Sequence, residues 1–347
     1  MSKKKHILVT GNNGYIGSVL VGMLVGKGYK VKGLDTGYYE NCFFYKTNAH
    51  KITQITKDIR NVSEKDVEGI DGIIHLAALS NDPLCEFDPN LTVDINHKAT
   101  VTLGKIAKKL GVKRFVFSSS QSMYGISKEE MVYEDSTKNP ITVYGKTKIN
   151  AEYDLGKLAD RNFTPVFLRP STVYGVSPRL RLDIVLNNLV AWAHTTGVIQ
   201  IKSDGTPWRP VVHIQDICNA FIAALEAPKE LVSNEAFNVG ESRNYRVKDM
   251  AELVQKFVPG CQVEYATSYS PDERSYKVNS DKIRRILKDY FSTKWSAEDG
   301  IVELLDAYKK NNLTYEKFIG TKFIRLNQLK NLINKKQLNS ALYWKNT

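Results

Sequence analysis

Short apolar runs alternate with longer segments of helical periodicity through the first half of the chain. The runs predicted to be strands are Ile7–Val9, Lys30–Asp35, Ile52–Ile59, Gly72–Ala77 and Arg114–Ser120. Between the last two, apolar positions recur at helical spacing over Asn90–Leu110, and Gly111 ends that helix. Strands that alternate with helices predict an α/β fold with a doubly wound parallel sheet, whose ligands bind at the carboxyl ends of the strands.

The first strand passes directly into a helix through three glycines, Gly11, Gly14 and Gly17. Such a turn leaves backbone N–H groups and the positive end of a helix free to receive a pyrophosphate. The next strand ends in Asp35, about twenty residues after the glycines, where a dinucleotide site places the acid that binds the adenosine ribose. Asp35 repels a 2′-phosphate, and Thr36-Gly37 supplies no arginine to accept one, so the predicted cofactor is NAD rather than NADP.

Composition narrows the class of protein further. The 347 residues carry a net charge of +12, but the lysines are dispersed and no recognised nucleic-acid module is present, so nucleic acid is not the expected partner. No apolar run approaches the roughly twenty residues of a membrane helix, and the apolar run after the basic start is too short for a signal peptide. We therefore expect a cytoplasmic protein that does not bind membranes. Its four cysteines lack metal-site spacing, and no metal is predicted.

A second group of candidate residues follows the strand that ends at Ser120. Tyr144 and Lys148 are four residues apart at the start of a predicted helix, so they share one helical face. A free tyrosine has a pKa of about 10, and a nearby ammonium and the positive nicotinamide ring would favour its phenolate. Ser120 could hydrogen-bond the same substrate oxygen. The arrangement suits proton removal from a hydroxyl group.

Five motifs occur in a recognisable order: TGNNGYIG, HLAA, FVFSSSQSMYG, YGKTK and LRPSTVYG. Together they resemble the extended short-chain dehydrogenase/reductase family, and within it the nucleotide-sugar epimerase/dehydratase group typified by UDP-galactose 4-epimerase. The resemblance covers about residues 5–308. It implies a catalytic triad of Ser120, Tyr144 and Lys148. It also implies that the NAD site is lined by Gly11, Gly14, Tyr15, Ile16, Gly17, Asp35, Asp58, Ile59, Ala77, Ala78, Tyr144 and Lys148.

The resemblance also divides the chain. It implies a Rossmann domain over residues 1–175, with a returning segment near 207–240, and a smaller α/β substrate lobe over 176–310. Residues 311–347 form a tail outside the family pattern. Leu326, Leu329, Leu332 and Ile333 of the tail line one side of a short helix. This helix is interpreted as a strap over its own subunit, with a dimer contact or a lid over the sugar site as alternatives.

Candidate substrate residues come from the later half and from the loop after Ser120. By resemblance, Asn188 approaches the substrate diphosphate, and Arg209 and Arg274 neutralise it through bidentate hydrogen bonds. Thr172 stands where many members carry an asparagine, so the contacts with the sugar must differ. The remaining candidates are Ser122 and the basic-segment residues Arg179 and Arg181. The basic segment resembles a branch found with surface-polysaccharide sugars, which includes 4-dehydrogenases, and this implies carbohydrate biosynthesis.

The expected reaction is hydride transfer between NAD and a sugar carbon, most simply C4, in a nucleotide-diphosphate sugar. A 4-epimerase is the first interpretation, a 4-dehydrogenase or 4-ketoreductase the second, and a non-catalytic NAD-binding protein the third. Related dehydratases carry an acidic pair after the catalytic hydroxyl residue, where this chain has Gln121 and Ser122, so elimination and decarboxylation are disfavoured. Resemblance further suggests a homodimer joined through the helices over 93–110 and 144–159.

Overall fold

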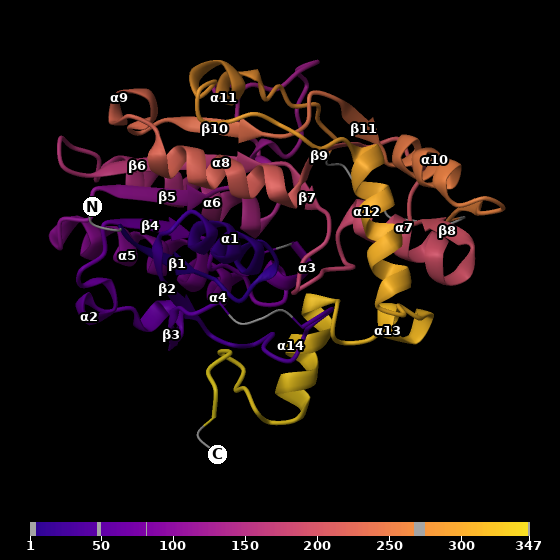
Figure 1. The fold of residues 1–347 in the computed structure, drawn as a ribbon, viewed down its shortest axis with the longest axis horizontal. Helices are drawn as coiled ribbons and strands as arrows, with labels where there is room; N and C mark the ends of the chain where they lie inside the picture. The colour runs from indigo at the N-terminus through magenta and orange to yellow at the C-terminus, as the bar shows by residue number, and fades with distance from the viewer. Residues whose placement is uncertain (1–4, 47–49, 81, 267–274, 346–347) are drawn as a thin grey trace.

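The computed structural model describes residues 5–46, 50–80, 82–266 and 275–345. Its centre is a seven-stranded sheet with the order β10-β6-β5-β4-β1-β2-β3, in which all neighbours are parallel (Figure 1). The strands are β1 (His6–Thr10), β2 (Lys30–Asp35), β3 (Thr53–Thr56), β4 (Gly72–His75), β5 (Arg114–Ser118), β6 (Thr164–Pro170) and β10 (Ala236–Val239). The chain leaves β1 for β2 and β3 on one side and returns to β4 on the other. This strand order confirms the predicted doubly wound α/β fold and places its switch point at β1.

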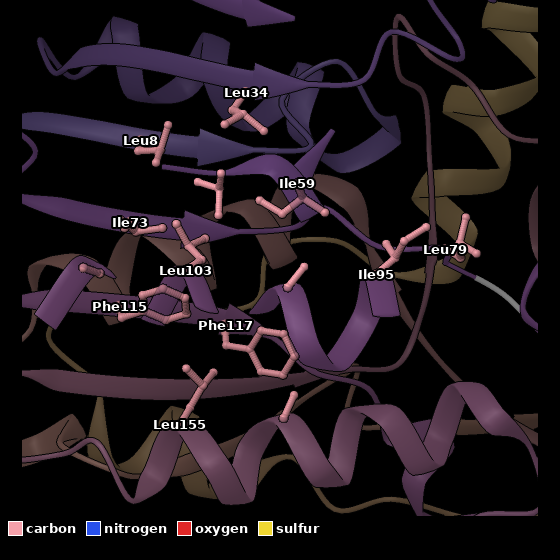
Figure 2. Close-up of a cluster of buried hydrophobic side chains, with 14 of the residues drawn as sticks. Leu8, Leu34, Ile59, Ile73, Leu79, Ile95, Leu103, Phe115, Phe117 and Leu155 are labelled. Carbon is pink, nitrogen blue, oxygen red and sulfur yellow. The ribbon is translucent and has the colours of Figure 1, made fainter. Parts of the chain in front are cut away.

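Alternation along the strands divides the core between the two faces of the sheet. Leu8 of β1 points to one face, while its neighbours Ile7 and Val9 point to the other. Figure 2 shows the first of these faces, where Phe115 and Phe117 of β5 join the same cluster. Both faces are predominantly apolar, as a buried parallel sheet requires, with buried polar side chains such as His75 and Arg169 near the carboxyl ends of the strands.

Helices cover both faces. The face that carries Leu8 packs against α4 (Pro89–Val93), the π-helical turn η2 (Asp94–Lys98), α5 (Ala99–Lys109), α6 (Val143–Gly156) and α14 (Arg325–Asn334). The opposite face packs against α1 (Tyr15–Gly26), α8 (Ile214–Glu226), α9 (Lys229–Val232) and α11 (Asp281–Ile286). Short elements at the edges are η1 (Ile59–Asn61), α2 (Glu64–Val67), α3 (Asp82–Cys85) and η3 (Gln121–Tyr124). The predicted helix over 90–110 is thus present but contains a π-helical turn.

A smaller α/β lobe lies beyond the carboxyl ends of the strands (Figure 1). It contains a three-stranded sheet of β7 (Thr172–Tyr174), β9 (Trp208–His213) and β11 (Asn244–Arg246), and a parallel pair of β8 (Val198–Ile201) and β12 (Gln262–Tyr265). Its helices are α7 (Val185–Thr196), α10 (Val247–Phe257), α12 (Ala297–Lys310) and α13 (Tyr315–Ile319). The segment 207–240, which was expected to return to the main sheet, is divided between the two lobes. Its β9 joins the small sheet, whereas α8 packs on the large sheet and β10 is a strand of it.

Among the described residues, no helix combines the length and the apolar character needed to span a bilayer.

Candidate active site

A single cleft with an empty volume of about 1810 Å³, part of it open to solvent, lies where the large sheet meets the smaller lobe. Its lining runs from the glycine turn to Thr172 and Arg209 of the smaller lobe, so one cleft spans the predicted dinucleotide site and predicted substrate residues. Most of the predicted site residues line it: Gly11, Gly14, Tyr15, Ile16, Gly17, Asp35, Asp58, Ile59, Ala77, Ala78, Ser120, Ser122, Tyr144, Lys148, Thr172, Arg181 and Arg209. The structure therefore brings together residues from both halves of the chain.

The glycine turn forms one wall of the cleft. Gly11 has a φ of +72°, and a Cβ on it would lie 2.9 Å from the backbone nitrogen of Ala77. A Cβ on Gly17 would lie 2.2 Å from the carbonyl oxygen of Gly11, so only glycine permits this approach of helix to strand. No side chain caps the first turn of α1 at Gly14. The free N–H groups of this turn suit the pyrophosphate of a dinucleotide, as the sequence predicted.

Asp35 lies at the end of β2, beside the glycine turn. Its carboxylate accepts hydrogen bonds from the backbone N–H groups of Gly37, at 2.8 Å, and Asn13, at 3.2 Å. Burial raises the pKa of Asp35, and these hydrogen bonds together with the nearby Arg179 and Arg325 oppose that shift. Asp35 thus combines a place in the predicted ribose site with a structural role, since it holds the turns on either side.

Asp58 and Tyr15 also line the cleft, but both make protein contacts of their own. Asp58 caps the short helix η1 and forms an ion pair with Arg60 at 2.6 Å. The hydroxyl group of Tyr15 donates to the carbonyl of Gly175 at 2.7 Å, which ties the start of α1 to the smaller lobe. Their predicted contacts with NAD would therefore use atoms other than those already engaged.

Helix α6 presents Tyr144 and Lys148 to the cleft from one face. Thr142 caps the helix by accepting a hydrogen bond from the N–H group of Gly145, which fixes the first turn. The Lys148 ammonium donates to the carbonyl of Ser118 at 2.7 Å and lies 5.5 Å from the centre of the Tyr144 ring. The tip of β5 thereby orients the lysine beside the phenol.

Burial dominates the titration of this pair. It raises the pKa of Tyr144 well above the ordinary value, although a hydrogen bond with Ser120 lowers it in part. Burial also lowers the pKa of Lys148 to about 8. In the protein alone, the phenol therefore stays protonated at neutral pH. Its ionisation needs a further positive charge in the cleft, such as an oxidised nicotinamide ring supplies.

The loop after Ser120 contributes neutral side chains. Gln121 is buried, donates to the carbonyl of Arg169 at 3.1 Å and accepts from the hydroxyl of Ser171 at 2.9 Å. Ser122 lines the cleft, and its hydroxyl accepts a hydrogen bond from Ser120 at 2.9 Å. Neither side chain can act as an acid or base near neutral pH.

Three predicted substrate residues are placed differently. Arg179 donates to the carbonyls of Tyr39 and Glu40, the first at 2.6 Å, and it does not line the cleft. Asn188 donates to the carbonyl of Leu182 at 2.8 Å and does not line the cleft either. In both cases backbone carbonyls of the protein take the donors that the prediction gave to a ligand. Arg274 lies outside the described residues.

Sequence reasoning missed several cleft residues, notably Asp82, Tyr276 and Arg325. Asp82 opens the short helix α3, so that helix brings a carboxylate to the same cleft as Tyr144. Arg325 belongs to the tail, and it reaches the cleft through contacts with residues that are far away in the sequence, such as Tyr39 and Arg179. An unusual arginine at the start of a predicted apolar helix was its only local signal.

This chain is similar to known proteins over most of its length. The family model described as NAD dependent epimerase/dehydratase family matches residues 7–240. The UDP-glucose 4-epimerase of Lactobacillus helveticus is 30% identical over 306 residues, which cover 81% of this chain and 90% of that protein. The structure of the Thermotoga maritima UDP-glucose 4-epimerase with UDP-glucose superposes with a TM-score of 0.78 at 25% identity, covering 88% of this chain and 99% of the other.

A second solved structure contains both kinds of ligand. The UDP-glucuronic acid 4-epimerase of Bacillus cereus, in complex with UDP-glucuronic acid and NAD, superposes with a TM-score of 0.75 at 27% identity. The matched region covers 88% of this chain and 99% of the chain of the Bacillus cereus protein.

Proposed function

Because this chain belongs to the NAD-dependent epimerase/dehydratase family, we propose that it is an NAD-dependent nucleotide-sugar 4-epimerase. The observation that carries the proposal is the shared cleft, in which the glycine turn and the Ser120, Tyr144 and Lys148 side chains face one space. The lining of the cleft includes residues predicted to bind the dinucleotide and residues predicted to bind the sugar nucleotide. The similar proteins named above are 4-epimerases of UDP-sugars, which supports this reaction over others.

The chain's own residues have separable roles in this proposal. Tyr144 takes the proton of the sugar C4 hydroxyl group and returns it later, so the protein ends the cycle unchanged. Lys148 stabilises the phenolate, and Ser120 hydrogen-bonds the same sugar oxygen. NAD bound beside the glycine turn would supply a reversible acceptor for the C4 hydride.

The substrate end of the cleft is assigned to the smaller lobe. Thr172 and Arg209 line the cleft there, and a guanidinium suits a diphosphate because it can donate two parallel hydrogen bonds. Ser122 lies beside Ser120 and is proposed to contact the sugar. Arg181 also lines the cleft and is proposed to act at the junction of both ligands, held there by an ion pair with Asp183 at 2.9 Å and a hydrogen bond to Ser80 at 2.9 Å.

The neutral loop after Ser120 favours epimerisation over elimination or decarboxylation. Both of those reactions need an additional acid or base, and Gln121 and Ser122 supply none. We further propose a homodimer in the cytoplasm that serves carbohydrate biosynthesis, which fits the exposed faces of α5 and α6 and the polar sugar ligands of the relatives.

Incubation of the purified protein with UDP-, GDP- and dTDP-sugars tests the proposal. The expected result is a mixture of two C4 epimers with no net change in NADH absorbance. A stable keto sugar or stoichiometric NADH would instead identify a 4-dehydrogenase or 4-ketoreductase, and the absence of turnover with all three classes would contradict an enzymatic role for the cleft.

A further inference from the structure

The C-terminal helix α14 places a buried arginine in the nucleotide cleft. Arg325, the first residue of α14, is only 2% exposed and lines the cleft together with Gly14 and Asp35. It comes from the tail and lies more than eighty residues after the end of the region matched by the family model. The position of this guanidinium is therefore a feature of this chain's tail rather than of the matched region.

Three contacts fix Arg325 in place. One terminal nitrogen, Nη2, donates to the carbonyl of Arg179 at 2.8 Å. The guanidinium also lies 4.3 Å from the centre of the Tyr39 ring, and the backbone N–H donates to the Asp183 carboxylate at 3.4 Å. The side chain is thus oriented without any bound ligand.

The other terminal nitrogen, Nη1, is buried and has no hydrogen-bond partner among the described residues. A buried cationic donor without a partner is costly, because burial removes water and nothing replaces it. Since Arg325 lines the cleft, a ligand in the cleft is the natural partner for Nη1. A guanidinium selects a phosphate or a carboxylate for this purpose.

The surroundings distinguish which ligand this is. Arg325 interacts electrostatically with Asp35, whose carboxylate accepts the N–H group of Asn13 in the glycine turn. It also stacks on Tyr39, a few residues after β2. These two contacts belong to the nucleotide half of the cleft, while the contacts with Arg179 and Asp183 place Arg325 beside the start of the smaller lobe, the lobe from which Arg209 also comes. The anion nearest to Arg325 would be the diphosphate of the dinucleotide.

The rest of the tail forms hydrogen bonds with loops beside the nucleotide half of the cleft. The Tyr38 hydroxyl donates to the carbonyl of Leu342 at 2.5 Å, and the Trp344 indole donates to the carbonyl of Thr36 at 2.7 Å. Arg60 donates to the carbonyl of Ala341 at 2.9 Å. These loops follow β2 and β3, and they carry cleft residues such as Thr36 and Tyr38. The tail therefore holds the wall of the adenosine end as well as supplying Arg325.

We propose that Arg325 donates to the diphosphate of bound NAD, and that the tail acts as a clasp that slows release of the cofactor. The proposal rests on NAD binding and not on the reaction at the sugar. It also gives the tail a purpose that suits an epimerase, since the same NAD molecule must stay bound through oxidation and reduction. A strap on the same subunit, the first interpretation of the tail helix, is the arrangement on which the clasp depends.

The test compares Arg325→Gln with Lys330→Gln, an exposed substitution on the same helix. The release rate of NAD from the full-length holoprotein is measured in a chase with excess ligand, and affinities for ADP-ribose, adenosine and UDP are measured by displacement. We expect Arg325→Gln to release NAD about tenfold to a hundredfold faster and to weaken ADP-ribose by a similar factor. Adenosine, UDP and the Lys330→Gln protein should be unaffected.

Other results would overturn the proposal. An unchanged NAD release rate would exclude the contact, an equal loss of adenosine affinity would show that Arg325 only shapes the adenosine pocket, and a loss confined to UDP would assign it to the substrate diphosphate. If circular dichroism shows that Arg325→Gln does not fold, Arg325→Lys is used instead. A folded Arg325→Lys protein that releases NAD at the wild-type rate would count against a hydrogen bond from Nη1, an atom that lysine lacks. Because release is measured without turnover, failure of the epimerase proposal leaves this result readable.

Discussion

Tyr144 depends on its neighbours for its proposed chemistry, because burial alone holds the phenol in its protonated form. Replacing it with phenylalanine removes the proton acceptor but keeps the ring that packs beside Lys148. We expect Tyr144→Phe to lower kcat by about a hundredfold to ten-thousandfold, the usual contribution of a general base, with NAD affinity nearly unchanged. Steady-state kinetics and cofactor titration measure the two effects separately.

The control for that variant lies on the same helix. Tyr153 of α6 is 66% exposed and faces away from the cleft, so Tyr153→Phe should leave kcat at the wild-type value. Wild-type turnover in Tyr144→Phe would remove the tyrosine from the mechanism.

Asp35 discriminates between the two dinucleotides by charge. Its carboxylate would repel a 2′-phosphate, while the neighbouring Arg179 and Arg325 guanidiniums would attract one if the carboxylate were absent. We expect Asp35→Ala to weaken NAD and to raise the relative affinity for NADP, as measured by titration with each cofactor. Asp35→Asn is the matched control, because it keeps an acceptor for the N–H groups of Gly37 and Asn13. Stronger binding of NADP than of NAD by the unmodified protein would contradict the argument.

Glu241 predicts a pH dependence of stability. It is buried, accepts hydrogen bonds from Tyr174 at 2.6 Å and Tyr245 at 3.2 Å, and burial raises its pKa to about 7. Because the folded pKa exceeds the unfolded value, the stabilisation is complete below about pH 4.5 and is lost as the pH rises through 7. The loss amounts to about 3 kcal/mol.

The Glu241→Gln protein lacks this titration. Its free energy of unfolding, measured by urea denaturation, should therefore rise relative to wild type between pH 5 and pH 8. A constant difference across that range would mean that Glu241 titrates normally.

Individual site residues were predictable where one local motif carried the signal. The glycine spacing, the acid at the end of β2 and the Tyr144–Lys148 pair all lie within short segments, and the cleft includes each of them. Arg325 and Asp82 were not predictable, because their approach depends on how distant elements pack. Arg179 was assigned from the basic composition of its segment and Asn188 from the family resemblance, and neither reveals that backbone carbonyls take their donors.

At the scale of elements, the π-helical turn η2 positions the loop after β4. Asn96 of η2 is buried, accepts a hydrogen bond from the N–H group of Leu79 at 2.8 Å and donates to its carbonyl at 2.9 Å. Leu79 follows Ala77 and Ala78 in the wall of the cleft. A π-helical turn at such a place often marks a functional site, and here it turns an amide toward a cleft-lining loop.

Removal of that amide should affect stability and cofactor binding together. Asn96→Ala removes the acceptor of the Leu79 N–H group and leaves the Leu79 carbonyl with only the Cys85 thiol as a donor, so we expect the free energy of unfolding to fall by about 1–3 kcal/mol and NAD affinity to fall with it. The exposed Asn90→Ala substitution on α4 serves as the control. Urea denaturation and NAD titration provide the measurements, and wild-type values in both for Asn96→Ala would contradict the bracing role.

Strand existence was easier to predict than strand length. The runs over 52–59, 72–77 and 114–120 were all predicted correctly as strands, but they leave the sheet at Thr56, His75 and Ser118. Beyond those points the chain lines the cleft rather than the core, through apolar or small residues after His75 and Ser118 and through Lys57, Asp58 and Ile59 after Thr56. Apolar periodicity does not distinguish these two kinds of burial, so the predicted ends were too long.

At the scale of the whole molecule, strands that are predominantly apolar on both faces require a layer of helices on each face. The doubly wound fold predicted from the sequence contains these two layers. The interleaving of the lobes was only partly predictable. Segment 207–240 contributes β9 to the small sheet and both α8 and β10 to the large one, because its apolar residues fit either core. The tail was predictable as an amphipathic helix, but its seat against Tyr38 and Thr36 depends on contacts about three hundred residues apart.

The last prediction concerns assembly. The inner faces of α5 and α6 are buried in the subunit through residues such as Leu103 and Leu155, so the proposed dimer must use their outer faces. Those faces expose Leu110 and Tyr153, the second at 66%, and aromatic side chains are enriched at protein interfaces. Light scattering should therefore give twice the 39.2 kDa chain mass. Tyr153→Glu should halve that mass, whereas Tyr133→Glu, an exposed tyrosine outside these helices, should not. A single-chain mass for the unmodified protein, or a dimeric Tyr153→Glu protein, would exclude this interface, because burial of a carboxylate in an apolar contact is costly.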